Sequence, residues 1–245
     1  MALTDPEIIQ KFDIKKGDKV LDIGGSMMQH SHLDIDTLVD IIRPEESPYS
    51  PSKLLAKNFV RVDFMKDKLP FKNKEFDFCL CTHVLEDLSY PFNLIEEMSR
   101  VSKRGYIATP SMGRDIIFSH VDMTDWLTGV RRVPGWSHHK WLFYKKGNYL
   151  KIIPKNYGIL YSGEFNYIKW KGEEETQYYW EKDVKYIEVK DLNVHELINE
   201  YRKYVLSNKN KLVKGITHIY LDNPIYYLKE FTKLLLKRGT GFKKQ

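Results

Sequence analysis

The feature that most constrains the fold is an ordered series of short apolar runs within residues 1–110. Five of them have the length and composition of buried strands, and they cover residues 19–23, 37–41, 59–63, 76–82 and 105–109. A helix is predicted over residues 91–101, where Leu94, Met98 and Val101 recur at helical spacing. Strands that alternate with helices or loops in this way are typical of α/β proteins. We therefore expect an α/β fold with a mostly parallel sheet.

Two adjacent glycines follow the first of these strands. A dinucleotide-binding fold would have G-x-G-x-x-G at this place, followed by a full helix. Here Gly24 and Gly25 are followed only by residues 26–37, which have little helical periodicity. Glycine lets a backbone approach a ligand without an intervening Cβ. The stretch therefore predicts a ligand-binding turn that has no pyrophosphate to hold.

Polar residues stand at the carboxyl ends of four predicted strands. They are Asp22 with the two glycines, Asp40, Asp63 with Phe64, and Thr82 with His83. Parallel strands bring such ends to one edge of a sheet, where ligands bind if the strand order reverses. Asp40 is placed to accept hydrogen bonds from two ribose hydroxyls, and Asp63 from an exocyclic amine. The set predicts an adenosine site, although an aspartate at a strand end is by itself a common turn residue.

In residues 19–110 these motifs resemble those of class I S-adenosylmethionine-dependent methyltransferases, in the same order. VLDIGG resembles the first motif of that group, and TLVDI resembles its acidic second strand. RVDFMKDKLPFKNKEFDFCLCTHVLED resembles the pattern from D-x-x-x-LPF through FDhhhxxhVLEH. The resemblance implies a Rossmann-like core and S-adenosyl-L-methionine as the cofactor.

The resemblance also implies which residues bind this cofactor. It puts Gly24 and Gly25 beneath the methionine part, Asp40 on the ribose, Asp63 and Phe64 at the adenine, and Thr82 and His83 along the inner edge; Asp22 is counted with them. The sequence departs from the group in two places. Residues 26–36 replace the usual glycine-rich loop and helix, whose N-terminus normally helps to hold the methionine carboxylate. Asp87 replaces the usual histidine after VLE.

The segment PGWSHHKWLFY, residues 134–144, is the candidate acceptor site. Its paired histidines are flanked by Trp136 and Trp141, whose aromatic faces suit a sugar ring or another flat polar acceptor. One of His138 and His139 is the candidate catalytic base, because an imidazole can take a hydroxyl proton at neutral pH. Adjacent residues of an extended segment point in opposite directions, so only one is expected to face the cleft. The alternative is that the histidines cap a hairpin and the tryptophans are core residues.

Other chemistries require motifs that this sequence does not contain. It has no G-x-x-x-x-G-K-[ST] loop, no G-x-S-x-G elbow and no H-E-x-x-H. Amino-methyltransferases carry a [DNS]-P-P-[YF] stretch where this sequence has CTHV. The sequence also lacks the Pro-Cys pair that would indicate an enzyme acting on the cytosine ring. No recognised metal spacing occurs, and we expect no resident metal. The alternative set is His138 or His139 with His120, Asp122 or Asp125.

The chain is expected to divide into a methyltransferase-like core and a C-terminal elaboration. The core is residues 1–160, with an acceptor-side insertion (111–140) and a hairpin (141–153); the α+β elaboration, packed on the core, is residues 161–245. Within the elaboration we predict a strand near 184–189 and helices near 194–206 and 224–238. The last helix carries an apolar stripe that we expect to dock on the protein.

Charge and cysteine content indicate the surroundings in which the chain acts. Residues 1–110 carry a net charge of −3 and residues 111–245 a net charge of +9. A basic half can attract phosphates, nucleic acid or an anionic membrane, but a solvated lysine-rich face is the simpler explanation. Cys79 and Cys81 share one face of a predicted strand and indicate buried, reduced thiols. With no signal pattern and no run of membrane-span length, we expect a cytoplasmic protein.

We interpret the chain as a methyltransferase that methylates an oxygen of a small polar acceptor. The leading acceptor is a sugar or nucleotide-linked sugar in surface-polysaccharide biosynthesis, by analogy with the family. One alternative is a nucleic-acid methyltransferase or binder that uses the basic C-terminal half. The other is a non-catalytic cofactor-binding module. We expect a small-molecule partner, neither nucleic acid nor stable membrane insertion, and the sequence leaves the oligomeric state open.

Overall fold

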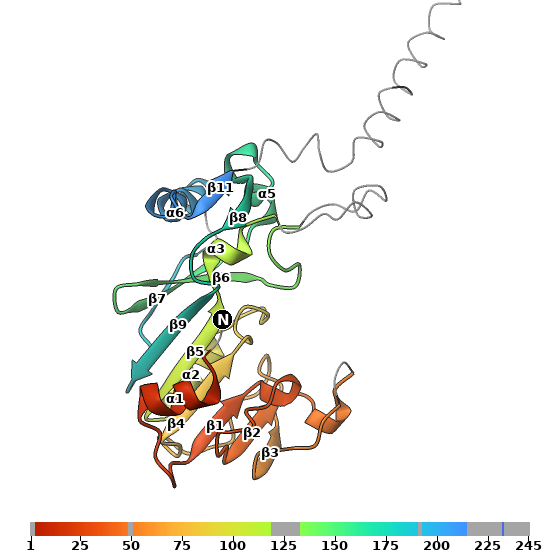
Figure 1. Cartoon of the computed structure of the whole chain (residues 1–245), viewed down its shortest axis with the longest axis vertical. Coiled ribbons are helices and arrows are strands. Elements are labelled where there is room, and N and C mark those ends of the chain that lie inside the picture. Colours follow the sequence, from red (N-terminus) through yellow and green to blue (C-terminus); the bar gives the residue numbers. More distant parts are fainter. Residues whose placement is uncertain (1–2, 49–50, 119–132, 191–192, 215–231, 233–245) are drawn as a thin grey trace, which may run out of the picture. The chain divides into compact units, whose positions relative to one another are not determined.

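The computed structural model describes residues 3–48, 51–118, 133–190, 193–214 and 232, which form two compact units (Figure 1). The first unit comprises Met1–Arg114, His138–Lys155 and Glu173–Leu197; the second comprises Asp115–Ser137, Asn156–Gly172 and Ile198–Gln245. Apart from residue 232, the predicted helix over 224–238 lies outside the described residues, as do His120, Asp122 and Asp125. Among the residues described, no helix has both the length and the apolar character needed to cross a membrane.

The first unit is built on a six-stranded sheet in the order β3-β2-β1-β4-β5-β9 (Figure 1). Its strands are β1 (Val20–Ile23), β2 (Thr37–Asp40), β3 (Asn58–Arg61), β4 (Phe78–Thr82), β5 (Arg104–Pro110) and β9 (Glu175–Glu181). The first five are parallel, and β9 runs antiparallel to β5. The predicted α/β class with a mostly parallel sheet is confirmed. Because β1 pairs with β2 on one side and β4 on the other, the strand order reverses between β1 and β4, where such sheets bind ligands.

Among the residues that the structure describes, the first unit has two helices of eight or more residues wholly within it, of which α2 was predicted from sequence. α1 (Asp5–Phe12) begins with a capping box, in which the Thr4 backbone N–H and hydroxyl both donate to Glu7 Oε2 at 2.8 Å. α2 (Phe92–Val101) connects β4 to β5. The crossover from β1 to β2 contains only the 3-10 turn η1 (Gly25–Met27), so the predicted lack of a full helix after the glycines is confirmed. Two further short segments are η2 (Pro44–Glu46) and α3 (Met112–Asp115).

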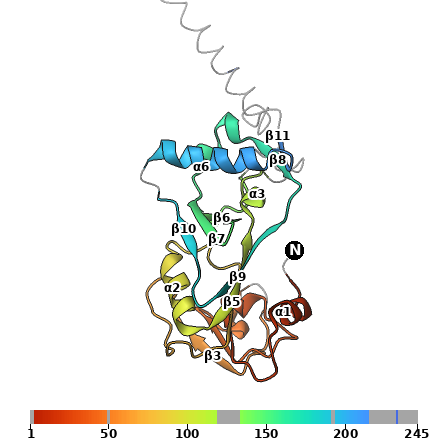
Figure 2. The ribbon, with the colours of Figure 1, turned by 90° about the vertical axis from the view of Figure 1, so that its left-hand side faces the viewer.

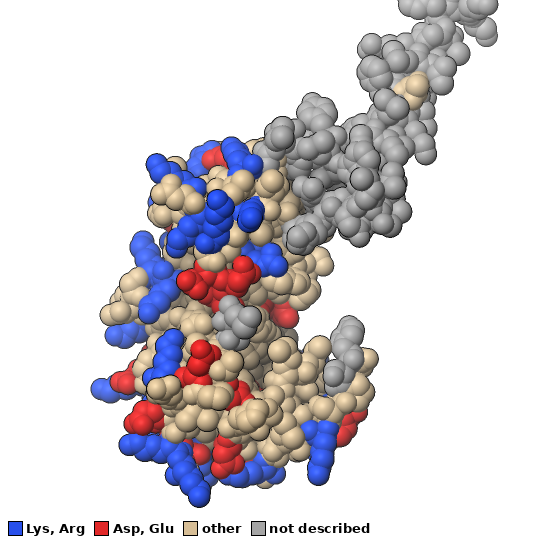
Figure 3. All heavy atoms as spheres, viewed as in Figure 1, with Lys and Arg blue, Asp and Glu red and all other residues tan. Residues whose placement is uncertain are grey.

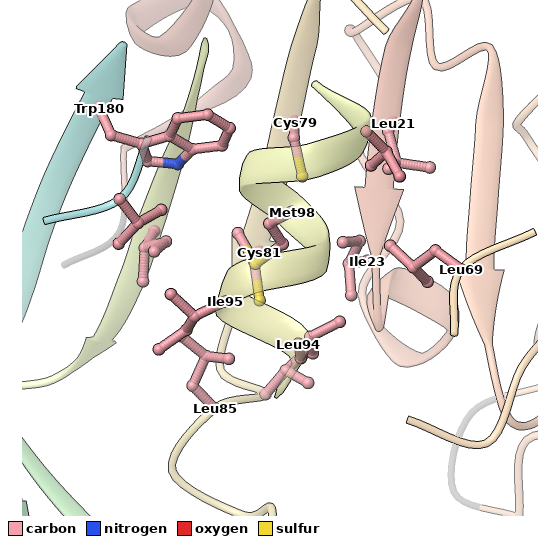
Figure 4. Packing of buried hydrophobic residues seen from close by; sticks show 14 of the residues in the cluster. Leu21, Ile23, Leu69, Cys79, Cys81, Leu85, Leu94, Ile95, Met98 and Trp180 are labelled. Carbon is pink, nitrogen blue, oxygen red and sulfur yellow. The ribbon is translucent and has the colours of Figure 1, made fainter. Parts of the chain in front are cut away.

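The two faces of the sheet have separate hydrophobic cores, because successive strand residues point to opposite sides. On one face, Cys79 and Cys81 of β4 belong to the same cluster as Met98 of α2 (Figure 4). On the other face, Leu80 of β4 packs in a cluster with Phe12 of α1. Figure 2 shows α1 and α2 on opposite sides of the sheet. Both cysteines are free and buried, as predicted, and burial raises the pKa of each thiol above its usual range.

A second sheet of the first unit contains the predicted hairpin. β6 (Trp141–Lys146) and β7 (Tyr149–Pro154) pair antiparallel around a tight turn at residues 147–148, where Gly147 has a φ of 59°. β10 (Tyr186–Glu188) pairs parallel with β7, which confirms the strand predicted near 184–189. The segment that holds the paired histidines therefore leads directly into an ordered strand.

The second unit is smaller and contains α5 (Tyr157–Leu160), η3 (Gly163–Phe165) and the antiparallel pair β8 (Tyr167–Trp170) and β11 (Leu212–Lys214). α6 (Val194–Ser207) confirms a predicted helix; it begins in the first unit and continues in the second. Within the second unit, Tyr201 of α6 stacks edge-on against Phe165, at 5.6 Å between ring centroids.

β9 comes from a part of the chain that was predicted to be an elaboration. Residues 175–181 pair with β5 along its whole length, from Arg104 opposite Glu181 to Pro110 opposite Glu175. The predicted division at residue 160 stays a prediction. The pairing adds that residues beyond this point complete the main sheet.

Candidate active site

The turn after β1 is held in a conformation that only glycine adopts easily. Gly24 has a φ of 76°, in the left-handed region, and its N–H donates to Val39 O at 2.8 Å. A Cβ on Gly24 would lie 2.2 Å from Val84 Cγ2. Val84 follows β4, so the loops after β1 and β4 touch at the point where the strand order reverses. This contact requires a residue without a side chain.

Asp22 lies directly beneath this turn. A Cβ on Gly25 would fall 2.0 Å from Asp22 Oδ2, and the Asp22 side chain is 1% exposed. Its Oδ1 has no hydrogen-bond partner among the described residues. Burial raises the pKa of Asp22 to about 6; His30 opposes this shift, while Asp40 and Asp5 add to it. The turn therefore covers a carboxyl group that is expensive to ionise.

Asp40 organises the crossover from β1 to β2. Its Oδ2 accepts a hydrogen bond from Ser26 N at 3.0 Å, and its Oδ1 accepts one from Ile41 N at 2.6 Å. The Ser26 hydroxyl donates in turn to Ile42 O at 2.7 Å. Each carboxylate oxygen can accept more than one hydrogen bond, so capacity for a ligand hydroxyl is left. The ribose contact of Asp40 stays a prediction.

The predicted adenine-binding pair follows β3. Asp63 Oδ1 accepts a hydrogen bond from Met65 N at 3.0 Å, and Asp63 Oδ2 lies 2.8 Å from Lys66 Nζ. The hydrogen bond from Lys66 lowers the pKa of Asp63. Phe64 is partly buried against the core beneath it. The carboxylate is thus already paired with a lysine, and its contact with adenine stays a prediction.

His83, which follows Thr82 at the end of β4, lies between two carboxylates. Its backbone has a φ of 55°, and its ring contacts Glu175 Oε1 at 3.1 Å and Glu86 Oε1 at 3.4 Å. Hydrogen bonds to Glu175 and Glu86 raise the pKa of His83 to about 10. The ring is therefore a cation at neutral pH and cannot act as a general base. The predicted cofactor contacts of Thr82 and His83 stay predictions.

Both paired histidines face one carboxylate, Asp87. Asp87 Oδ1 is 3.8 Å from His138 Nε2 and 3.9 Å from His139 Nε2. The two imidazole rings pack edge to face, with 4.6 Å between their centroids. The expectation that adjacent rings point in opposite directions is wrong. It assumed an extended segment, whereas His138 lies in a turn. Which of the two histidines is catalytic, if either, stays a prediction.

Three contacts hold the histidine segment against the loop that carries Asp87. Lys140 N donates to Glu86 O at 2.7 Å, and Lys140 Nζ donates to Ser89 Oγ at 2.9 Å. Trp141 Nε1 donates to Leu88 O at 2.9 Å. Lys140 and Trp141 come just after the histidines, so these contacts fix the backbone that follows the histidines against the residues on either side of Asp87.

The two predicted acceptor tryptophans have different surroundings. Trp141 belongs to the first unit and packs edge-on against Phe92, at 5.2 Å between ring centroids. Trp136 belongs to the second unit, is 38% exposed, and receives a hydrogen bond from Tyr157 OH on its backbone oxygen at 3.2 Å. Within that unit its backbone N–H donates to Asp115 Oδ1 at 3.3 Å. Substrate contact of either tryptophan stays a prediction.

Sequence reasoning missed Glu175 as a member of this site. It ends the run Glu173–Glu175, which resembles a solvated charge cluster, yet it begins β9 and reaches His83. The alternation of buried residues at Thr176, Tyr178 and Trp180 is the signal that predicts a strand here. Once β9 is placed beside β5, its first residue falls at the same sheet edge as the other site residues.

Residues 33–108 match the family described as "Methyltransferase domain". The matched segment runs from before β2 to within β5, and it includes Asp40, Asp63, His83 and Asp87. The predicted resemblance to class I S-adenosylmethionine-dependent methyltransferases is confirmed over this segment. With it, S-adenosyl-L-methionine is confirmed as the cofactor of this kind of domain.

Individual relatives are similar to this chain over different shares of its length. A stretch of 55 residues is 46% identical to an uncharacterised protein of Methanocaldococcus jannaschii, and it covers 22% of this chain but only 27% of that protein. A SAM-dependent methyltransferase from Aquifex aeolicus is 23% identical, with a TM-score of 0.33 over 45% of this chain and 66% of that one. The PH0226 protein of Pyrococcus horikoshii is 15% identical, with a TM-score of 0.38 over 71% of this chain and 84% of that one.

Proposed function

We propose that the protein transfers a methyl group from S-adenosylmethionine to an oxygen of a small polar acceptor. The observation that carries this proposal is the close approach of Gly24 to Val84 where the strand order reverses. It brings the loop with the predicted cofactor residues against the loop that carries His83, Glu86 and Asp87. Donor and acceptor must be held in line for methyl transfer, and two touching loops at one sheet edge suit that requirement.

The residues after β1 and β2 fit an adenosyl ligand. Gly24 and Gly25 leave the backbone of the turn without side chains, and Asp22 holds a buried oxygen with no partner in the described part of the chain. Asp40 keeps capacity for hydroxyl donors beyond its two backbone hydrogen bonds. When bound, S-adenosylmethionine supplies an electrophilic methyl group. Asp40 would hold its ribose, and the glycine turn its methionine part.

The proton of an acceptor hydroxyl must leave as the carbon–oxygen bond forms. Within the first unit, the group of Asp87, His138 and His139 is the candidate to take it. A carboxylate within 4 Å of both rings stabilises an imidazolium once the proton has moved. His138 has a side chain that is 60% exposed, against 6% for His139. We therefore assign His138 as the ring that an acceptor reaches and His139 as the ring that packing holds in place.

A sugar or nucleotide-linked sugar, as used in surface-polysaccharide biosynthesis, is the acceptor class that we propose. Carboxylate and imidazole groups hydrogen-bond to hydroxyls, and an anchored indole offers an apolar face to a sugar ring. Asp87, the two histidines and Trp141 supply these groups. Nucleic acid is a weaker candidate. On the face drawn in Figure 3, basic and acidic side chains of the described residues are interspersed and do not form a continuous basic surface.

Transfer of label from methyl-labelled S-adenosylmethionine to a panel of nucleotide-linked sugars tests this function. We expect a product methylated on a hydroxyl, detected by mass spectrometry. His138→Gln should lower kcat by about 100-fold while the Kd for the donor stays unchanged, as for loss of a general base. His195→Gln, an exposed histidine of α6, is the matched control and should be silent. Label on nucleic acid alone, or full turnover by His138→Gln, would contradict the assignment.

A further inference from the structure

We propose that Asp87, His138 and His139 form a binding site for a divalent transition-metal ion, and that Zn²⁺ is the ion that suits it best. The three side chains offer two imidazole nitrogens and one carboxylate oxygen, and these atoms all lie within 4.8 Å of one another. Two nitrogens and one oxygen form a ligand set typical of zinc sites with an open fourth position. Mg²⁺ and Ca²⁺ prefer oxygen ligands, so they suit this set poorly.

The separations between these atoms support an ion rather than direct hydrogen bonds. Asp87 Oδ1 is 3.8 Å from one Nε2 and 3.9 Å from the other, which is longer than a hydrogen bond. Ligands of a tetrahedral zinc ion with bonds of about 2.0–2.1 Å lie about 3.3 Å apart. Binding therefore requires the Asp87 contacts, now 3.8 and 3.9 Å, to shorten by about half an ångström, and the two ring nitrogens start within 4.8 Å of each other. The exposed His138 ring is free of the tight packing that holds His139, so it can make this adjustment.

A second group of one aspartate and two histidines shows how these side chains are arranged when they hydrogen-bond directly. Near α1, Asp5 contacts His30 and His32, and there His30 Nδ1 makes a direct contact of 2.5 Å with Asp5 Oδ1. His32 N donates to the other carboxylate oxygen at 2.7 Å. This carboxylate is closed by hydrogen bonds on both oxygens. The Asp87 group instead has both rings turned toward one oxygen at longer range.

The backbone around the proposed site is held in register. The hydrogen bonds from Lys140 to Glu86 O and Ser89 Oγ, and from Trp141 to Leu88 O, tie the two ligand-bearing segments together next to the ligands. Such supporting contacts are what positions the ligands of a metal site. Glu86 precedes Asp87 and is 1% exposed; its Oε2 has no hydrogen-bond partner among the described residues.

The ion would also change the chemistry of the site, a role that rests on the proposed function. Zn²⁺ at this site would take the two imidazoles as ligands, and an acceptor hydroxyl in the open position would give up its proton to solvent more easily, because the ion stabilises the alkoxide that remains. Without the ion, an imidazole is the base. Ion binding itself does not depend on any acceptor, so it is tested without turnover.

Calorimetric titration of the chelator-treated full chain with Zn²⁺ tests the site, and Co²⁺ provides a second readout through its visible absorption. We expect one tight site per chain, with Mg²⁺ giving no heat. Asp87→Asn and His138→Gln should each weaken Zn²⁺ binding by at least about 10- to 100-fold. Substituting a residue that only supports a metal ligand already lowers metal affinity by that much, so losing a ligand should cost no less. Both residues are exposed enough that substitution should leave the melting temperature nearly unchanged.

His32→Gln is the matched control, because it removes a histidine from the other Asp–His grouping. It should leave Zn²⁺ affinity and stoichiometry as in the wild type. Binding that is equally weak in the wild type and the Asp87 and His138 variants would overturn the site, as would a loss of binding in His32→Gln. Absence of methyl transfer alongside intact Zn²⁺ binding would count against the proposed function only.

Discussion

The two sides of the point where the strand order reverses, between β1 and β4, are built in different ways. On the β1–β2 side, Asp40 accepts hydrogen bonds from the backbone of Ser26, in the crossover, and of Ile41, directly after β2, and the glycine turn folds over Asp22. On the β4 side, the polar groups come from separate stretches of the chain: the loop after β4, the turn at residues 137–138, and the start of β9. The first side is a local structure that can be inferred from consecutive residues. The second depends on chain segments that meet only in the folded protein.

The largest effect expected on the β1–β2 side is from Gly24→Ala. The new Cβ would meet Val84 while the backbone remains in the left-handed region, so strain and overpacking add. We expect the free energy of unfolding to fall by about 3–5 kcal/mol in urea titrations. Gly147→Ala is the control: it has a similar φ of 59° but nothing within 4 Å of its Cβ, so it should lose only about 1–2 kcal/mol. Equal losses would show that the contact between the two loops is not tight.

Asp22 should make stability depend on pH in the acidic range. Its folded pKa of about 6 lies above the value of about 3.9 in an unfolded chain, so the native state binds more protons between these values. The contribution of Asp22 to the free energy of unfolding is therefore largest below about pH 4. It falls by about 3 kcal/mol as the pH rises to above about 6. Asp22→Asn cannot ionise and should flatten this slope in unfolding titrations at several pH values.

The exposed Asp34, whose carboxylate pairs with Lys57 at the surface, supplies the control for this prediction. Asp34→Asn should retain the wild-type slope. If Asp22→Asn also retained it, the carboxyl beneath the glycine turn would not be the costly group described here.

A smaller effect is expected from His83 on the β4 side. Its folded pKa of about 10 lies above the ordinary histidine value, so its contribution to stability is complete below about pH 6.5 and is lost as the pH rises through about 10. His83→Gln should remove that decline, measured as the melting temperature across neutral to alkaline pH. The change is modest because the ring is partly exposed to solvent. A decline of the same size in the variant would show that the pairs with Glu86 and Glu175 contribute nothing measurable.

The strands of the core could be predicted from sequence because each is buried and apolar. β2 and β4 are short apolar runs that end in a polar residue, and β1 is an apolar run interrupted only by Asp22; their order follows from the α/β alternation. β9 was missed because its outward residues are polar or aromatic and it follows an acidic run, although its buried residues alternate. Its antiparallel pairing with β5 is a long-range contact that no local pattern specifies.

The acceptor side shows where sequence reasoning fails for a physical reason. The motif HVLED identifies the loop after β4, and the paired histidines are identifiable from sequence as candidate catalytic residues. That both rings turn toward Asp87 depends on the turn at residues 137–138 and on the anchoring of Lys140 and Trp141, contacts made across more than 50 residues of chain. Spacing along the chain therefore could not reveal the cluster.

The central claim is that the β1–β2 side binds S-adenosylmethionine, and calorimetric titration of the full chain with this compound tests it most directly. We predict one equivalent bound, and a Kd weakened by about 10- to 100-fold in Asp40→Ala, which loses a charged acceptor. Asp40 also accepts backbone hydrogen bonds from Ser26 and Ile41, so its loss could destabilise the fold as well as the site. The milder variant Asp40→Asn, and the melting temperature of each variant, distinguish weaker binding from weaker folding. Asp34→Ala should bind as the wild type does. Binding of NAD with no binding of S-adenosylmethionine would contradict the account.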